Sequence, residues 1–255
     1  MRKTFFIWLF IAAAFFASGQ GQTLYTVNFV KPKPGMKSTF ETNWKLHLAK
    51  FHKTSDKRNV YEIMSGAHQG TYCIVEGPLS YADMDVDKPN AKAHGLDLEK
   101  TFSPYLEDNT VNGTYRWDDT ASYNANVPAE KFFVQVTHIK FGQQIETLRE
   151  AKRSALINAK LPTPAPISYN YYVQIWAGSD PVTVSVRNLK TGFKELDNNF
   201  MGANPNPPTA FKDAYVKQYG QDAWDARSKL LDNNANIASR EAYIMKLRKD
   251  LSSAQ

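Results

Sequence analysis

The sequence predicts an α+β protein in which one β-α-β-β-α-β unit occurs twice along a chain of 255 residues. Residues 61–85 and 173–197 align without a gap at a constant offset of 112. The segments before and after them also match in type, since each is preceded by a strand pattern and a helix pattern. The identical pairs are Ile63 with Ile175, Gly66 with Gly178, Thr71 with Thr183 and Asp85 with Asp197.

The first unit begins with an alternating strand pattern at 24–30 that ends at prolines. A helix is expected next, because apolar residues recur there at three- or four-residue spacing. A hairpin then follows, with strands at 59–64 and 71–77 around the Gly-bearing turn, and a helix start at 80–85. A last strand is expected at 113–117. The apolar stripe of the helix is Met36, Phe40, Trp44, Leu48 and Phe51.

The second unit repeats this order with a strand at 131–142, a helix that stops at Pro162, and a hairpin between 171 and 188. A further helix is expected around 223–231. Residues 240–248 fit either a strand or a helix, and the strand is preferred because the first unit needs one in that place.

The order β-α-β-β-α-β is the ferredoxin-like split unit, which has helices on only one face of its antiparallel sheet. Two units in one chain can cover each other's bare faces, so we expect the two sheets to pack into an intrachain α/β barrel. The polar, aperiodic stretch 118–130 marks the boundary between the units. The expected organisation is residues 22–120 for the first repeat and 130–251 for the second.

The chain resembles the dimeric α/β-barrel proteins, in particular the NIPSNAP-like and antibiotic-biosynthesis-monooxygenase-like branch. The resemblance is carried by VNFVKPKPGMKSTFETNWK and by the hairpin-to-helix segment that contains GTYCIVEG and SYADMD. These are fold-level patterns rather than catalytic signatures. The resemblance implies that one chain supplies both halves that relatives obtain by dimerising, so we expect a monomer.

The first 19 residues have the features of a secretory signal peptide. Arg2 and Lys3 precede the uncharged apolar run at 4–17, and small residues stand before a cut at Gln20. The alternative is an uncleaved membrane anchor, but the run is shorter than the roughly 20 residues that a span needs. We therefore expect a secreted or periplasmic protein without stable membrane insertion after cleavage.

Composition excludes several kinds of partner and chemistry. The 31 basic and 25 acidic residues are mixed along the chain, so no concentrated basic face for nucleic acid is expected. Cys73 is the single cysteine; it is expected to be a small buried hydrophobe, and the alternative is a reactive nucleophile. His47 and His52 are five residues apart, which does not place them on one helix face, so no metal site is expected. The sequence has no Walker loop and no dinucleotide-type G-x-G-x-x-G motif, and no cofactor is expected.

The candidate site is a pocket between the first helix and the sheet. His47 is expected on the same helix face as the apolar stripe. Asn28 lies on the first strand, where some relatives carry an Asn. The haem-degrading relatives, however, place their histidine on the later helix of the unit. Core packing is the alternative for each candidate. The expected ligand-binding residues are Asn28, Trp44, His47, Tyr172 and Trp176.

These features predict an exported protein that binds a small apolar or aromatic ligand without turning it over. One alternative is a cofactor-independent or haem-linked enzyme of the monooxygenase kind. Another is a non-catalytic scaffold that contacts a partner. Because no acid–base or metal constellation is visible in the sequence, we expect that the chain is not an enzyme.

Overall fold

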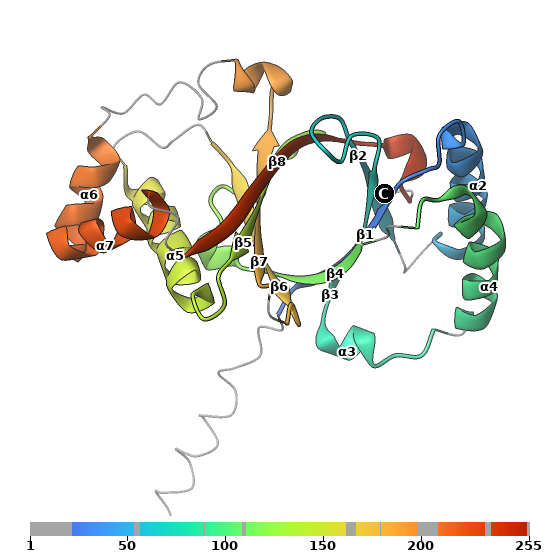
Figure 1. The fold of residues 1–255 in the computed structure, drawn as a ribbon, viewed down its shortest axis with the longest axis horizontal. Helices are drawn as coiled ribbons and strands as arrows, with labels where there is room; N and C mark the ends of the chain where they lie inside the picture. The colour runs from blue at the N-terminus through green and yellow to red at the C-terminus, as the bar shows by residue number, and fades with distance from the viewer. Residues whose placement is uncertain are drawn as a thin grey trace, which may run out of the picture.

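A computed structural model describes residues 22–53, 57–88, 90–108, 111–161, 167–178, 180–197, 209–232 and 236–253. Eight antiparallel strands form a closed barrel in the order β1-β3-β2-β8-β5-β7-β6-β4 (Figure 1). The expected signal peptide at 1–19 lies outside the described residues. The strands are β1 (Leu24–Val30), β2 (Arg58–Ile63), β3 (Tyr72–Leu79), β4 (Val111–Trp117), β5 (Lys131–Ile139), β6 (Tyr169–Ile175), β7 (Val182–Leu189) and β8 (Ile237–Leu247).

The barrel consists of two four-stranded sheets with the same internal order. The first is β4-β1-β3-β2 and the second is β8-β5-β7-β6, so each is the sheet of a ferredoxin-like unit. Ile63 and Ile175, matched by the sequence repeat, are the last residues of β2 and β6, which occupy equivalent places. The predicted α/β barrel with two ferredoxin-like repeats is therefore confirmed. The segment at 240–248 lies mainly in β8, which confirms the preferred strand.

Two seams join the sheets edge to edge. At one seam β2 pairs with β8, from Tyr61 opposite Leu247 to Ile63 opposite Met245. At the other, β4 pairs with β6, from Thr114 opposite Ile175 to Trp117 opposite Tyr172. The backbone polar groups on these edges are paired within the chain, so the sheets do not need a second copy to satisfy them.

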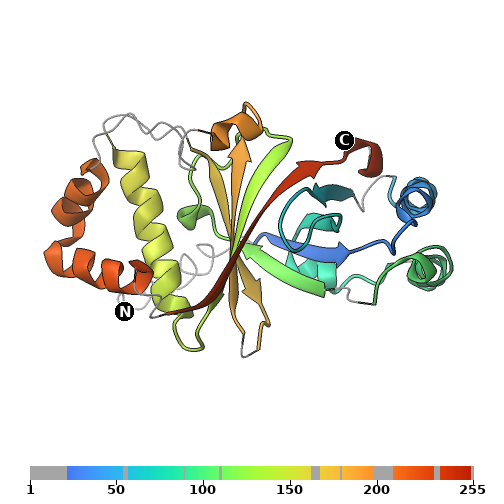
Figure 2. The same ribbon diagram turned by 45° about the horizontal axis from the view of Figure 1, so that its top comes forward.

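Helices lie outside the barrel, in two groups on opposite sides (Figures 1 and 2). The first sheet is covered by α2 (Lys37–Phe51), α4 (Ala91–Thr101) and the short η4 (Lys249–Leu251). The second sheet is covered by α5 (Gln144–Lys160), on which α6 (Ala210–Tyr219) and α7 (Gln221–Asp232) pack. Within the described ranges, no helix has the length and apolarity that crossing a membrane requires.

The helix starts expected after both hairpins are shorter than predicted. The first is the single turn α3 (Tyr81–Met84), which ends well before α4 begins. Ser80 caps it by accepting a hydrogen bond from the backbone N–H of Asp83, and the Asp83 carboxylate accepts one from the Ser80 N–H. The corresponding turn of the second half is the 3-10 helix η3 (Phe193–Leu196). The remaining short elements are η1 (Ser103–Tyr105) and η2 (Asp119–Ala121).

Candidate functional site

The barrel encloses a cavity of about 930 Å³. Successive residues of a strand point to opposite faces, so alternate residues of all eight strands line it. On β1, for example, Tyr25, Val27 and Phe29 face inward. Valines are frequent on the other walls, and Gly113 of β4 adds no side chain at an inward position. The valines and Gly113 thus leave room between the larger aromatic side chains that also point into the lumen.

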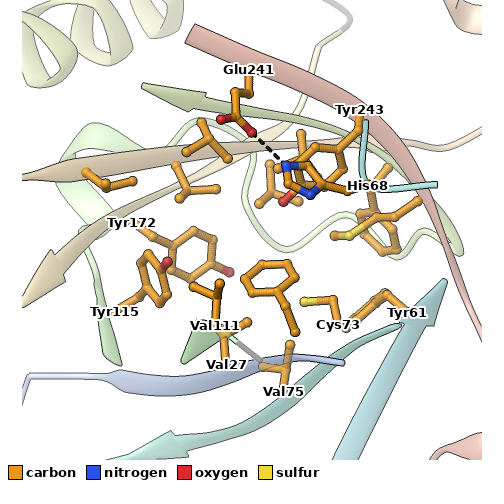
Figure 3. A pocket seen from close by; sticks show the side chains of 18 of the residues that line it. Val27, Tyr61, His68, Cys73, Val75, Val111, Tyr115, Tyr172, Glu241 and Tyr243 are labelled. Atoms are coloured by element: carbon orange, nitrogen blue, oxygen red, sulfur yellow. Dashed lines mark hydrogen bonds and ion pairs between the residues drawn. The ribbon is translucent and has the colours of Figure 1, made fainter. Parts of the chain in front are cut away.

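Five tyrosines add hydroxyl groups to this largely apolar lumen. Figure 3 labels Tyr61, Tyr115, Tyr172 and Tyr243 among them. The rings of Tyr25 and Tyr172 meet edge to face, with 5.5 Å between their centroids. Burial raises the pKa of the Tyr115 hydroxyl to about 12 and raises the pKa of the other four as well. All five hydroxyls are therefore neutral near pH 7 and can donate or accept hydrogen bonds. They are Tyr25, Tyr61, Tyr115, Tyr172 and Tyr243.

Cys73 also lines the lumen, from the start of β3 (Figure 3). Burial raises the pKa of its thiol to about 12. The thiolate, which is the nucleophilic form, is therefore scarce near pH 7. Cys73 is a small buried wall residue, as expected from its place in the strand pattern.

Histidine–carboxylate pairs gather at one mouth of the barrel. His68, in the β2–β3 turn, has its Nε2 2.8 Å from a carboxylate oxygen of Glu241 on β8. His138, on β5, has its Nδ1 3.0 Å from Asp180 and its Nε2 3.9 Å from Glu241. The side chains of His68 and Glu241 are about half exposed, so this mouth is in contact with solvent. A histidine held by a carboxylate is the arrangement that a general base needs.

The opposite end of the lumen is neutral. It is lined by the amides of Asn59, Asn170 and Asn188, and by Val127 and Ala129 from the connection between the two repeats. The Asn188 amide donates to the backbone oxygens of that connection at 3.1 and 3.2 Å. The lumen is thus polarised, with ionisable pairs at one end and amides at the other.

The five residues predicted to bind a ligand do not form one pocket. Tyr172 lines the lumen, but Asn28 lies between the inward Val27 and Phe29 and therefore faces outward. Trp44 and His47 are buried on α2, outside the barrel. Trp176 is 71% exposed, with its ring beside that of Tyr81.

The predicted pocket between helix and sheet is filled by apolar side chains. Phe40, Trp44 and Tyr72 belong to a continuous buried cluster that occupies this space. His68, Glu241 and Tyr115 were not among the residues predicted from the sequence. The alternation of residues along each strand could have identified the lumen-lining residues. It separates inward from outward residues once the face that the helices cover is known.

Comparison with known proteins identifies the fold. No family model matches the sequence, and no curated protein matches it either. An anthrone oxidase-like protein has a similar structure, with a TM-score of 0.54 at 11% identity over 90% of this chain and 92% of that one. A Fusobacterium nucleatum protein provisionally assigned as a monooxygenase gives 0.53 at 10% identity, covering 92% and 96%. Chlorite dismutase from Candidatus Nitrospira defluvii, in complex with imidazole, gives 0.51 at 7% identity, covering 91% and 93%.

These similarities place the chain in the dimeric α/β-barrel fold. They also correct one expectation from the sequence, namely that the chain is not an enzyme. The solved structures with this fold carry the names of a monooxygenase, an oxidase-like protein and a dismutase, so the fold is one that enzymes use. The expectation failed because it rested on the absence of local motifs, whereas the polar groups here converge from separate strands.

Proposed function

We propose that the chain is an oxygenase-type enzyme that oxidises an aromatic substrate with dioxygen inside the barrel lumen. The observation that carries the proposal is a largely apolar lumen of about 930 Å³ with histidine–carboxylate pairs at one mouth. This volume lies in the range of roughly 300–1,000 Å³ that is typical of small-molecule sites. The oxidase and monooxygenase names of structures with this fold support the reaction class.

The substrate class follows from the lining. Apolar and aromatic walls favour a flat, conjugated molecule, and neutral phenol hydroxyls can hydrogen-bond to its carbonyl or hydroxyl groups. The substrate must also lose a proton easily, because a conjugated anion can transfer an electron to dioxygen without a metal. A fused aromatic ketone with an adjacent CH₂ group meets both requirements.

In this proposal His68 is the general base. Its imidazole takes a proton from the activated C–H, and Glu241 orients the ring and stabilises the imidazolium that forms. The tyrosine hydroxyls stabilise the oxygen anion of the conjugated substrate. Dioxygen oxidises the anion, one oxygen atom stays on carbon, and the other leaves as water with the two hydrogens of the CH₂ group. The overall reaction is R–CH₂–R′ + O₂ → R–CO–R′ + H₂O.

The residues do not fit a haem-linked version of this reaction. The haem-degrading relatives implied by the sequence resemblance carry their histidine on the later helix of the unit. In the first half this helix is α4, and its histidine is His94. Its Nε2 lies 3.1 Å from that of His47 and 3.2 Å from that of His52, which leaves no width for a porphyrin. The later helices of the second half, α6 and α7, contain no histidine. We derive no step through haem.

We place the chain on the monooxygenase-like rather than the NIPSNAP-like branch, because the similar structures carry oxygenase names. We also propose export after removal of residues 1–19, and a monomer, since one chain closes the barrel. The N-terminal mass of the mature protein tests the first of these, and sedimentation tests the second.

The test measures oxygen uptake with 1,8-dihydroxyanthrone as the probe. The metal-stripped wild-type protein should form the corresponding quinone and consume one O₂ per turnover. His68→Gln should lower kcat by about 10²–10⁴-fold, the usual contribution of a positioned base. Leu46→Gln, on the exposed side of α2, is the control and should keep the wild-type rate.

Two results would contradict the proposal. One is tight binding of the probe with no oxygen uptake, which would favour the ligand-binding protein expected from the sequence. The other is activity that requires added haemin, which would favour the haem-linked alternative.

A further inference from the structure

Three histidines converge outside the barrel, in the helix layer of the first half. His47 lies on α2, His52 directly follows the end of that helix, and His94 lies on α4. The Nε2 atoms are 3.1 Å apart between His47 and His94 and 3.2 Å apart for each of the other two pairs. His47 and His52 are buried and His94 is half-buried.

Hydrogen bonds among these three nitrogens cannot all be favourable. Each Nε2 is either a donor, with a proton, or an acceptor, with a lone pair. A closed ring of three cannot alternate the two states, so at least one pair must set donor against donor or acceptor against acceptor. A cation at the centre removes the conflict, because it accepts all three lone pairs at once.

The rings are oriented as ligands of one ion would be. Their centroids are 4.7 to 5.1 Å apart, wider than the nitrogens, so the rings diverge from a shared centre toward which the Nε2 atoms point. An ion about 2.0–2.1 Å from each nitrogen would sit about 1 Å out of their plane, with N–metal–N angles of about 100°. This is close to tetrahedral geometry with a fourth position open.

Asp97 supplies the outer support that metal-binding histidines usually have. Its carboxylate accepts a hydrogen bond at 2.8 Å from Nδ1 of His47, which leaves Nε2 of that ring as the lone-pair atom. The other carboxylate oxygen accepts a hydrogen bond from Lys50 at 2.8 Å. The ring of Trp44 stacks on those of His47 and His52 and fixes their orientation.

The five-residue spacing of His47 and His52 does not keep their rings apart, contrary to the expectation from the sequence. That expectation assumed that both residues lie on a helix, where five residues separate two faces. The helix ends at Phe51, and the chain leaves it at His52, so that ring turns back toward His47. The third nitrogen comes from a segment 42 residues further along the chain, which no local motif reveals.

We propose that Nε2 of His47, His52 and His94 bind one divalent transition-metal ion of the zinc class, with Asp97 orienting His47. Three imidazoles suit zinc and its neighbours rather than Ca²⁺ or Mg²⁺, which prefer oxygen ligands. The half-buried His94, together with a surface hollow of about 280 Å³ beside His52, gives the ion access from solvent. The ion clamps α2 to α4, and it lies on the other side of the sheet from the lumen, so this proposal is independent of the proposed oxidation.

Titration of the metal-stripped full chain with Co²⁺ tests the site. The wild-type protein should bind one Co²⁺ per chain, with the strong visible absorption of tetrahedral Co²⁺, and Zn²⁺ should abolish that absorption by displacement. Zinc should also raise Tm in proportion to the logarithm of its concentration above Kd. Absence of one-to-one binding, or the weak absorption of octahedral Co²⁺, would overturn the proposal.

Variants locate the ion. His94→Gln changes a half-buried ring and should lower Co²⁺ affinity at least 100-fold, while the metal-free Tm and circular dichroism match those of the wild type. Asp97→Asn keeps the shape of the cluster and should lower affinity about 10- to 100-fold. His68→Gln is the matched control at a histidine outside the cluster and should bind as the wild type does. Equal losses in His68→Gln and His94→Gln would refute the assignment.

Discussion

The two halves of the molecule share a sheet but differ in the chemistry that covers its outer face. In the first half, α2 and α4 bring together three imidazoles, a carboxylate and a lysine. In the second half, the buried Glu150 on α5 accepts a hydrogen bond from Tyr215 at 2.6 Å and pairs with Arg227 at 2.8 Å. The guanidinium of Arg227 also lies over the ring of Trp224.

This difference shows which parts of the repeat are constrained. Strand order and closure need both sheets to stay alike, because each edge must pair with the other half. The helix layers have only to exclude water from an outer sheet face, and many side-chain combinations achieve this. The second half pairs its buried Glu150 with Tyr215 and Arg227, whereas the first brings three imidazole nitrogens within 3.2 Å of one another.

Truncating one tryptophan in each helix layer should give the largest contrast. Trp44 is buried and donates a hydrogen bond to the backbone oxygen of Leu251 at 2.7 Å. Trp44→Ala should lower the free energy of unfolding by about 4 kcal/mol, the usual cost of removing a buried large aromatic side chain. Trp224→Ala, at a half-buried ring, should cost about 2 kcal/mol. Urea unfolding measures both, and equal losses would show that the two layers contribute similarly to stability.

Removing the buried carboxylate of the second half should have a smaller effect. Glu150→Ala leaves Arg227 and the hydroxyl of the fully buried Tyr215 without this partner, so we expect a loss of about 2 kcal/mol, discounted for the partial exposure of Arg227. Glu146→Ala is the control, since its ion pair with Arg149 is exposed and should change stability by less than about 0.5 kcal/mol. If Glu150→Ala were as stable as this control, the hydrogen bond and ion pair of Glu150 would not contribute measurably to stability.

The smallest effect concerns the contact between the halves beyond β8. Arg248 reaches Glu41 and Glu62 of the first half and also binds Asp250. The hydrogen bonds from Arg248 lower the pKa of Asp250 to about 2, from about 3.9 in an unfolded chain. Because the folded pKa is the lower one, this contribution to stability is present above about pH 4 and is lost as pH falls toward 2.

Asp250→Asn should therefore flatten the dependence of stability on pH in that window. The variant and the wild type should differ slightly at pH 6 and converge at pH 2, as measured by urea unfolding at each pH. Parallel curves with a constant offset would contradict this assignment and point to packing at Asp250 instead.

The strands could be predicted well from the sequence because it contains a repeat at a constant offset. The same order of strands and helices can therefore be read from each of the two copies. Where one copy was ambiguous, as at 240–248, the other copy settled it, and the same comparison confirmed Ile63 and Ile175 as equivalent. The lengths of the helix turns after the hairpins were not predictable in this way, because the two copies differ there.

The candidate site was less predictable, for a physical reason. Its residues come from several strands, and each looks ordinary in its local window. His68 meets Glu241 across 173 residues of sequence, and His47 meets His94 across 47. Only closure of the barrel and the packing of α2 on α4 bring these groups together.

Barrel closure also sets an order of events during folding. β8 is paired with β5 along its length. It also forms the seam with β2, which lies more than 180 residues earlier in the chain. Bringing such distant segments together costs loop-closure entropy before their contacts can form, so we expect this step to be slow. The edge of β2 stays unpaired until β8 is in place. A nascent chain halted before residue 237 would therefore expose this edge to chaperones or to other copies of the same chain.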